Sequence, residues 1–132
     1  MSTAWTEQDR AHVFARVGAA AHFPGVQRDD VNGHVSFSVR GRRFAWLQVD
    51  HHGDDQLTLC VKAPPGEQEA LIARGEPFFV PSYLGSKGWV GVDLAPGAAP
   101  DWDEASALLE QGWRMVAAKK LVDEYDGRAE SQ

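Results

Sequence analysis

The chain has 132 residues, of which 43% are hydrophobic and 24% charged, and its net charge is −6. This length and composition suit one globular domain with its own core, so we expect residues 1–132 to form a single domain. The acidic balance argues against avid, non-specific binding of nucleic acid, for which a basic surplus is usual, but it is compatible with a local basic patch.

The first half of the chain predicts one helix and three strands. Thr6 suits a helix N-cap, and the Pro-Gly pair at residues 24–25 ends that helix. Alternation of apolar and polar residues predicts strands at residues 35–39, 44–49 and 57–61, and the first two form a β-hairpin over residues 34–49. The loop HHGDD at residues 51–55 has metal-capable side chains, but no second His or Cys cluster completes a site.

The second half predicts a short helix at residues 67–74, strands at 78–80 and 89–94, and a final helix. Asp101 suits the N-cap of that helix, and an apolar stripe continues from Trp102 to Lys120. Residues 127–132 are expected to form a frayed tail. The order α-β(3)-α-β(2)-α predicts a two-layer α+β domain with a five-stranded antiparallel sheet and helices on one face.

Four segments in this order resemble the MmcQ/YjbR-like family of small bacterial proteins. They are GRRFA at residues 41–45, LTLCVK at 57–62, VPSY followed by GWV at 80–90, and the helix at 102–121. Gly112 and Trp113 stand where many members have Ser-Tyr, and Ala118 where many have Pro. The resemblance implies a fold similar to secretion chaperones and frataxin-like (CyaY-like) proteins. It also suggests DNA as a ligand, because the hairpins of such proteins look like paired wings.

Basic side chains gather at two predicted turns. Arg40, Arg42 and Arg43 lie at the hairpin tip, and Lys87 lies at the tip of the loop before the fifth strand. Guanidinium groups at a hairpin tip can contact phosphates, and a β-ribbon can enter a groove of DNA. The alternative is a turn that only keeps the protein soluble.

A second candidate surface is the sheet face that the helices leave uncovered. Alternation places Ser36, Ser38, Lys62 and Trp89 on this face, and we expect Trp89 to be partly exposed as an anchor for a protein partner. The alternative is that a loop or a terminal segment covers it. The face of the sheet on which Trp46 lies depends on the length of the hairpin turn. A three-residue turn places Trp46 on the open face, and a two-residue turn places it on the face that the helices cover.

No paired-carboxylate, nucleophile or metal signature stands out in the sequence, so we expect a binding protein that uses no cofactor rather than an enzyme. The single cysteine, Cys60, and the lack of a leader or a long apolar run lead us to expect a cytoplasmic protein that is not bound to a membrane. The leading expectation is DNA binding, and the alternatives are a protein-interaction module and an enzyme or small-molecule binder with an unrecognised pocket. A basic stripe joining Arg42, Arg43 and Lys87 would favour DNA, whereas an exposed apolar patch around Trp89 would favour protein.

Overall fold

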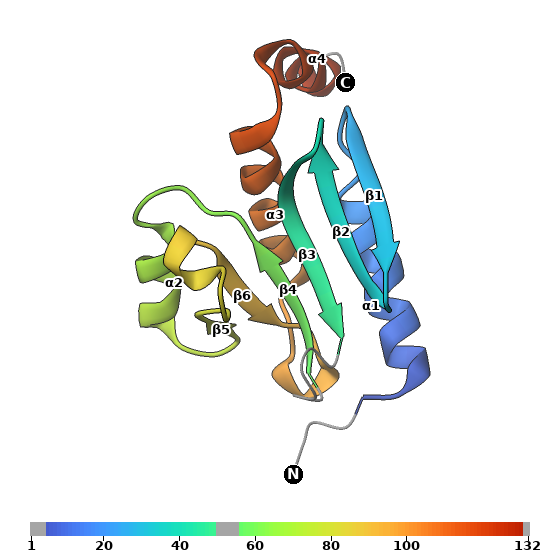
Figure 1. Ribbon diagram of the computed structural model, residues 1–132, viewed down its shortest axis with the longest axis vertical. Coiled ribbons are helices and arrows are strands. Elements are labelled where there is room, and N and C mark those ends of the chain that lie inside the picture. The colour runs from blue at the N-terminus through green and yellow to red at the C-terminus, as the bar shows by residue number, and fades with distance from the viewer. Residues whose placement is uncertain (1–4, 50–55, 131–132) are drawn as a thin grey trace.

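The computed structural model describes residues 5–49 and 56–130, so the predicted loop at 51–55 lies outside the described residues (Figure 1). The elements in chain order are α1 (Glu7–Ala20), β1 (Val26–Val31), β2 (His34–Val39), β3 (Arg42–Val49), β4 (Leu57–Val61), α2 (Glu67–Arg74), β5 (Phe78–Phe79), η2 (Gly85–Lys87), β6 (Val90–Asp93), η3 (Pro96–Ala98), α3 (Trp102–Val116) and α4 (Lys119–Glu130).

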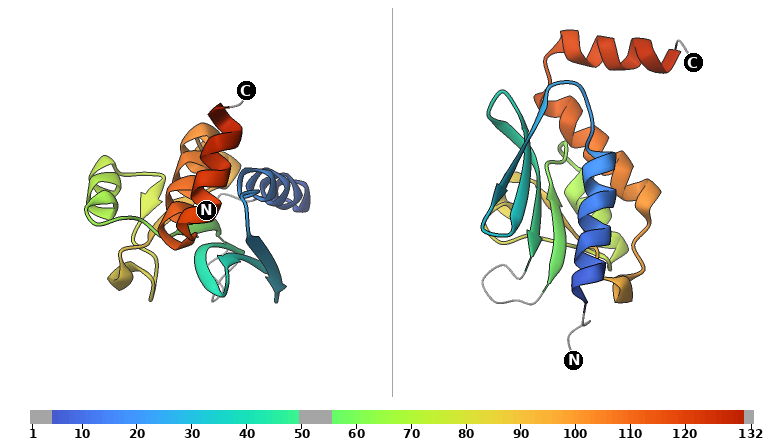
Figure 2. Two further views of the ribbon diagram at one scale, coloured as in Figure 1. Left: turned by 90° about the horizontal axis from the view of Figure 1, so that it is seen from above. Right: turned by 90° about the vertical axis from the view of Figure 1, so that its right-hand side faces the viewer.

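The strands form one antiparallel sheet in the order β1-β2-β3-β4-β6-β5. Helices α1 and α3 cover one face, α2 lies beside β5 and β6, and α4 crosses one end (Figures 1 and 2). The α+β class and the antiparallel sheet are therefore confirmed. No α-helix of the described residues covers the opposite face, which is called the open face below.

The sheet has six strands, so the expected count of five is wrong. The additional strand, β1, lies at the edge of the sheet, and most of its side chains are exposed, which explains why its sequence VQRDDV shows no apolar alternation. Asn32 and Gly33 have φ values of 53° and 82° and join β1 to β2 in a two-residue turn. An Asn-Gly pair is a strong hairpin signal, and it was the sequence feature that could have identified this strand.

A β-bulge in β3 determines the face of the sheet on which Trp46 lies. The turn between β2 and β3 has two residues, Arg40 and Gly41, yet Phe37 pairs with Ala45 while the next residue, Ser38, pairs with Arg43. Phe44 is therefore the extra residue of a β-bulge. Both Phe44 and Ala45 are fully buried, and Trp46 is left on the open face. Neither of the two simple registers predicts this arrangement.

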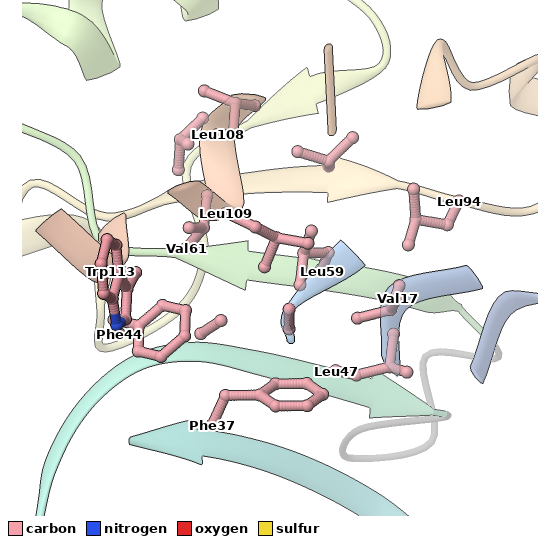
Figure 3. Packing of buried hydrophobic residues seen from close by; sticks show 14 of the residues in the cluster. Val17, Phe37, Phe44, Leu47, Leu59, Val61, Leu94, Leu108, Leu109 and Trp113 are labelled. Atoms are coloured by element: carbon pink, nitrogen blue, oxygen red, sulfur yellow. The ribbon is translucent and has the colours of Figure 1, made fainter. Parts of the chain in front are cut away.

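The core lies between the sheet and helices α1 and α3 (Figure 3). Leu109 and Trp113 of α3 are completely buried, and the indole Nε1 of Trp113 donates a hydrogen bond of 3.0 Å to the carbonyl oxygen of Pro24. The predicted cap of α3 is confirmed, because the Asp101 carboxylate accepts hydrogen bonds from the backbone N–H groups of residues 103 and 104. The apolar stripe of the last predicted helix thus packs onto the sheet as expected.

The predicted last helix is in fact two helices. Helix α3 ends at Val116, Ala117 is extended with ψ of 141°, and α4 turns across the end of the molecule (Figure 2). The break returns Leu121 and Tyr125 to the core, where the Tyr125 ring contacts Trp113 with 5.1 Å between centroids. Helix α4 also includes residues 127–130, which the sequence led us to expect in a frayed tail.

Arg114 links α4 to α3. Its guanidinium donates to the Asp126 carboxylate at 2.7 and 3.2 Å and to the Glu110 carboxylate at 3.2 Å, and the Tyr125 hydroxyl donates to Glu110 at 2.8 Å. Hydrogen bonding from Arg114 lowers the pKa of Asp126. Hydrogen bonding to Glu110, followed by burial, raises the pKa of Tyr125. We therefore expect the docking of α4 to depend on pH.

We expect the contribution of Asp126 to stability to be lost in acid. Because the folded-state pKa of Asp126 is lowered, this contribution is fully present above its unfolded value of about 3.9 and disappears as the pH falls through the folded value. Asp126→Asn should melt below the parent at neutral pH, and the difference should close below about pH 4. Asp29→Asn, which removes a carboxylate of β1, serves as the control. A difference in melting temperature that is independent of pH would contradict the assignment.

Candidate nucleic-acid interface

Many of the cationic side chains are neutralised by a neighbouring carboxylate. The ion pairs are Arg10 with Glu7, Arg28 with Asp30, Arg74 with Glu104, Arg114 with Glu110 and Asp126, Lys119 with Asp123, and Arg128 with Glu124. Within residues 5–49 and 56–130, no ion pair involves Arg40, Arg42, Arg43, Lys62 or Lys87. These five side chains, named the basic group below, include all four of the predicted nucleic-acid contacts.

The fold connects the basic group along the start of β3. Arg40 and Arg42 flank Gly41 at the turn between β2 and β3, and both are exposed. The backbone N–H of Lys62 donates to the carbonyl of Phe44 at 2.8 Å, which fixes Lys62 beside the first residues of β3. Lys62 and Lys87 line the same cavity of about 250 Å³, together with Glu69 of α2. Lys62, expected only in the partner surface, is therefore the link between the hairpin and Lys87.

Carboxylates lie at both ends of the molecule. The end opposite the β2–β3 turn holds the turn between β1 and β2 and the first turns of α1 and α3 (Figure 1). Glu7 and Asp9 lie in the first turn of α1, and Asp101, Asp103 and Glu104 lie at the start of α3. Helix α4, which crosses the end that holds the β2–β3 turn, carries Asp123, Glu124 and Asp126, so the negative charge is not confined to one end (Figure 1).

Arg43 is stacked on Trp46 on the open face. The guanidinium carbon lies 3.9 Å from the centroid of the indole ring, within cation–π range. Both residues line a cavity of about 150 Å³ with His34, Ser36 and Asp29. The buried indole Nε1 of Trp46 has no acceptor among the residues that the structure describes. Sequence reasoning missed this pair because the bulge that orients Trp46 leaves no signal in the apolar pattern.

The expected exposure of Trp89 is wrong. This side chain is 5% exposed, so the protein covers it, which was the alternative to a partner anchor. Gln68 Nε2 of α2 donates to the carbonyls of Gly85 and Trp89 at 2.9 and 2.7 Å and holds α2 against the segment before β6. Ser36 is also buried, at 7% exposure, and Ser38 is half-buried. The expected partner surface is not an exposed patch around Trp89.

The fold and the basic group define a small two-layer α+β protein with a locally basic hairpin on an acidic chain. The family model described as YjbR matches residues 21–115, and the chain belongs to the YjbR family. The matched region begins at the end of α1 and includes all six strands, whereas α4 lies beyond it. No curated protein matches the chain. None of the described helices has the length and apolar character needed to cross a membrane.

Proposed function

We propose that this protein is a non-enzymatic DNA-binding protein whose basic group contacts phosphates. The observation that carries the proposal is that these five cations lack carboxylate partners among the described residues, whereas Arg74 and Arg114 are neutralised within the fold. A cation with no intramolecular partner is available to replace a condensed counterion of DNA, and counterion release supplies most of the non-specific affinity.

The position of Lys62 supports DNA over a protein partner. It extends the basic group from the hairpin tip toward Lys87, which is the arrangement that favours DNA. The protein-interaction alternative depends on an exposed apolar patch around Trp89, and that side chain is buried. DNA is therefore the better-supported ligand.

The test is a titration of a DNA duplex at several salt concentrations. Arg40→Ala/Arg42→Ala should weaken binding and should flatten the plot of log K against log salt by about 2, if each arginine neutralises one phosphate. The matched control is Arg28→Ala/Arg128→Ala, which removes two ion-paired arginines from β1 and α4 and should leave the slope unchanged. An unaltered slope in the hairpin variant, or no binding by the parent protein at low salt, would contradict the proposal.

A further inference from the structure

We propose that a cavity at the end of β6 binds a small organic cation that carries a guanidinium group, with Asp93 and Glu76 as its carboxylate partners. This inference goes beyond the proposed function, because the cavity is lined by residues outside the basic group and takes a ligand whose charge is opposite to that of DNA. Failure of this proposal would leave DNA binding by the basic group unaffected.

The cavity has a volume of about 370 Å³, which is within the range of sites that hold small molecules. Its walls come from the residue before β4, the segment that leads into β5, the end of β6, and η3. These segments are far apart in the sequence and meet toward the end of the molecule opposite the β2–β3 turn (Figure 1). The fold therefore builds the cavity from four separate pieces of chain.

Strand pairing places Asp93 and Phe79 on the open face. Gly91 pairs with Phe79, and Asp93 follows Gly91 by two residues on β6, so Asp93 and Phe79 project to the same side of the sheet. The residue between the two positions on β6, Val92, lies in the core. The backbone N–H of Asp93 donates to the Pro77 carbonyl at 2.9 Å and holds the end of β6 beside the segment that carries Phe79. A carboxylate and a phenyl ring are thereby brought to one cavity.

The polar groups of the lining are mainly hydrogen-bond acceptors. Among the described residues that line the cavity, Gln56 alone carries a side-chain N–H donor. Gly97 contributes backbone atoms only, and the third residue after it, whose N–H would bond the Gly97 carbonyl in a continued 3₁₀-helix, is Pro100, which has no N–H. A ligand rich in N–H donors therefore matches this lining better than an anion does.

Neither carboxylate is neutralised within the part of the chain that the structure describes. The ion pairs of residues 5–49 and 56–130 include neither Glu76 nor Asp93. Asp93 Oδ1 accepts the backbone N–H of Ala95 at 3.0 Å, which orients the side chain and leaves further lone pairs for a ligand. The acidic first turns of α1 and α3 lie at the same end of the molecule and add to the negative potential. The cavity therefore attracts cations.

Arg74 shows how this fold binds a guanidinium beside the cavity. The guanidinium carbon lies 5.0 Å from the centroid of the Phe78 ring, and the group donates to the Glu104 carboxylate at 2.6 and 3.2 Å. Phe79 and Asp93 offer the same two kinds of group to the cavity, but no cation of the described residues pairs with Asp93. A planar guanidinium can bind a carboxylate through two parallel hydrogen bonds and lie against a ring, so it uses this lining more fully than a compact ammonium does.

The experiment is an NMR titration of the ¹⁵N-labelled protein with butylguanidinium, followed at the backbone amides of Phe79, Gly91 and Gly97. Butylurea is the matched neutral probe, because it has nearly the same shape and no charge. Butylguanidinium should shift these amide signals in a saturable manner, and butylurea should bind at least about tenfold more weakly. Nα-acetylarginine methylamide carries the same cation on a peptide backbone. Binding as tight as that of butylguanidinium would assign the site to an arginine side chain of a protein, and weaker binding to a free small molecule.

Asp93→Asn should weaken butylguanidinium binding by about tenfold, because it removes the charge while its amide oxygen can still accept the Ala95 N–H. Phe79→Leu should weaken binding by about threefold through loss of the ring. Asp103→Asn is the matched control, since it removes one carboxylate from the start of α3, outside the cavity, and it should bind as the parent does.

Three results would overturn the proposal: no saturable shift in the parent, equal binding of butylurea and butylguanidinium, or equal losses in Asp93→Asn and Asp103→Asn. Shifts confined to amides remote from the cavity would reject the site as well. The parent titration needs no variant, so the proposal stays testable if Asp93→Asn fails to fold.

Discussion

Trp113→Ala should lower the free energy of unfolding by about 3–5 kcal/mol, because it removes a completely buried indole from the centre of the core. The side chain stacks on Phe23 with 5.1 Å between ring centroids and contacts Tyr125 of α4 at the same distance. Its Nε1 also satisfies the carbonyl of Pro24, which would be left without this donor. The loss should therefore include both packing and the docking of α4.

Urea unfolding of the parent and of Trp113→Ala measures this effect as a shift of the midpoint. Trp102→Ala is the control, since Trp102 lies on the same helix but is only half-buried, and it should cost less. Equal stability of Trp113→Ala and the parent would contradict the conclusion that Trp113 lies at the centre of the core.

Gly112→Val should destabilise the protein by about 1–3 kcal/mol, the usual cost of overpacking. A Cβ at this position would lie 3.0 Å from the Lys62 carbonyl oxygen, 3.0 Å from Val61 Cγ2 and 3.2 Å from the Phe44 carbonyl oxygen. The two carbonyls belong to the backbone of the sheet, and the Phe44 carbonyl accepts a hydrogen bond from the N–H of Lys62, so they cannot move aside as a flexible side chain would. Helix α3 thus approaches the sheet at a distance that a larger residue does not permit.

Gly127→Val provides the control for Gly112→Val. Both glycines lie within helices, but a Cβ on Gly127 would meet no atom within 4 Å. Valine has a higher intrinsic helix propensity than glycine, so Gly127→Val should be neutral or slightly stabilising. Comparing the melting temperatures of the two variants separates the effect of helix propensity from the effect of packing. Equal changes in melting temperature would show that the close approach of α3 to the sheet does not exclude a larger side chain at residue 112.

Local signals predict much of this fold. The Thr6 and Asp101 caps, the β2–β3 hairpin and the apolar face of α3 all depend on residues close together in sequence, and each is present. Strand β1 was missed because exposure on both faces of an edge strand erases the alternation by which strands are recognised. The Asn32–Gly33 turn was the remaining local signal for it.

The site was less predictable because its geometry depends on tertiary contacts. The bulge at Phe44 changes which side chains face the helices, and alternation alone cannot report an inserted residue. Burial of Trp89 accompanies the contact of Gln68 with a segment about 20 residues away in sequence, which no local pattern encodes. The cations were identified from their clustering in sequence, but the role of Lys62 as a link required the pairing of β4 with β3.

The edge strand β1 also bears on how copies of this protein meet one another. Since Val31 pairs with His34 directly beside a two-residue turn, residues 27, 29 and 31 direct their backbone hydrogen bonds to β2, and residues 26, 28 and 30 direct theirs outward. A second copy that joins this edge through a two-fold axis must place one residue opposite itself. Pairings centred on Arg28 or Asp30 oppose like charges, which is destabilising, whereas the pairing centred on Asp29 opposes the two Asp29 side chains but places Arg28 opposite Asp30 on both sides. The charges of this edge therefore restrict the register in which a second copy can join it.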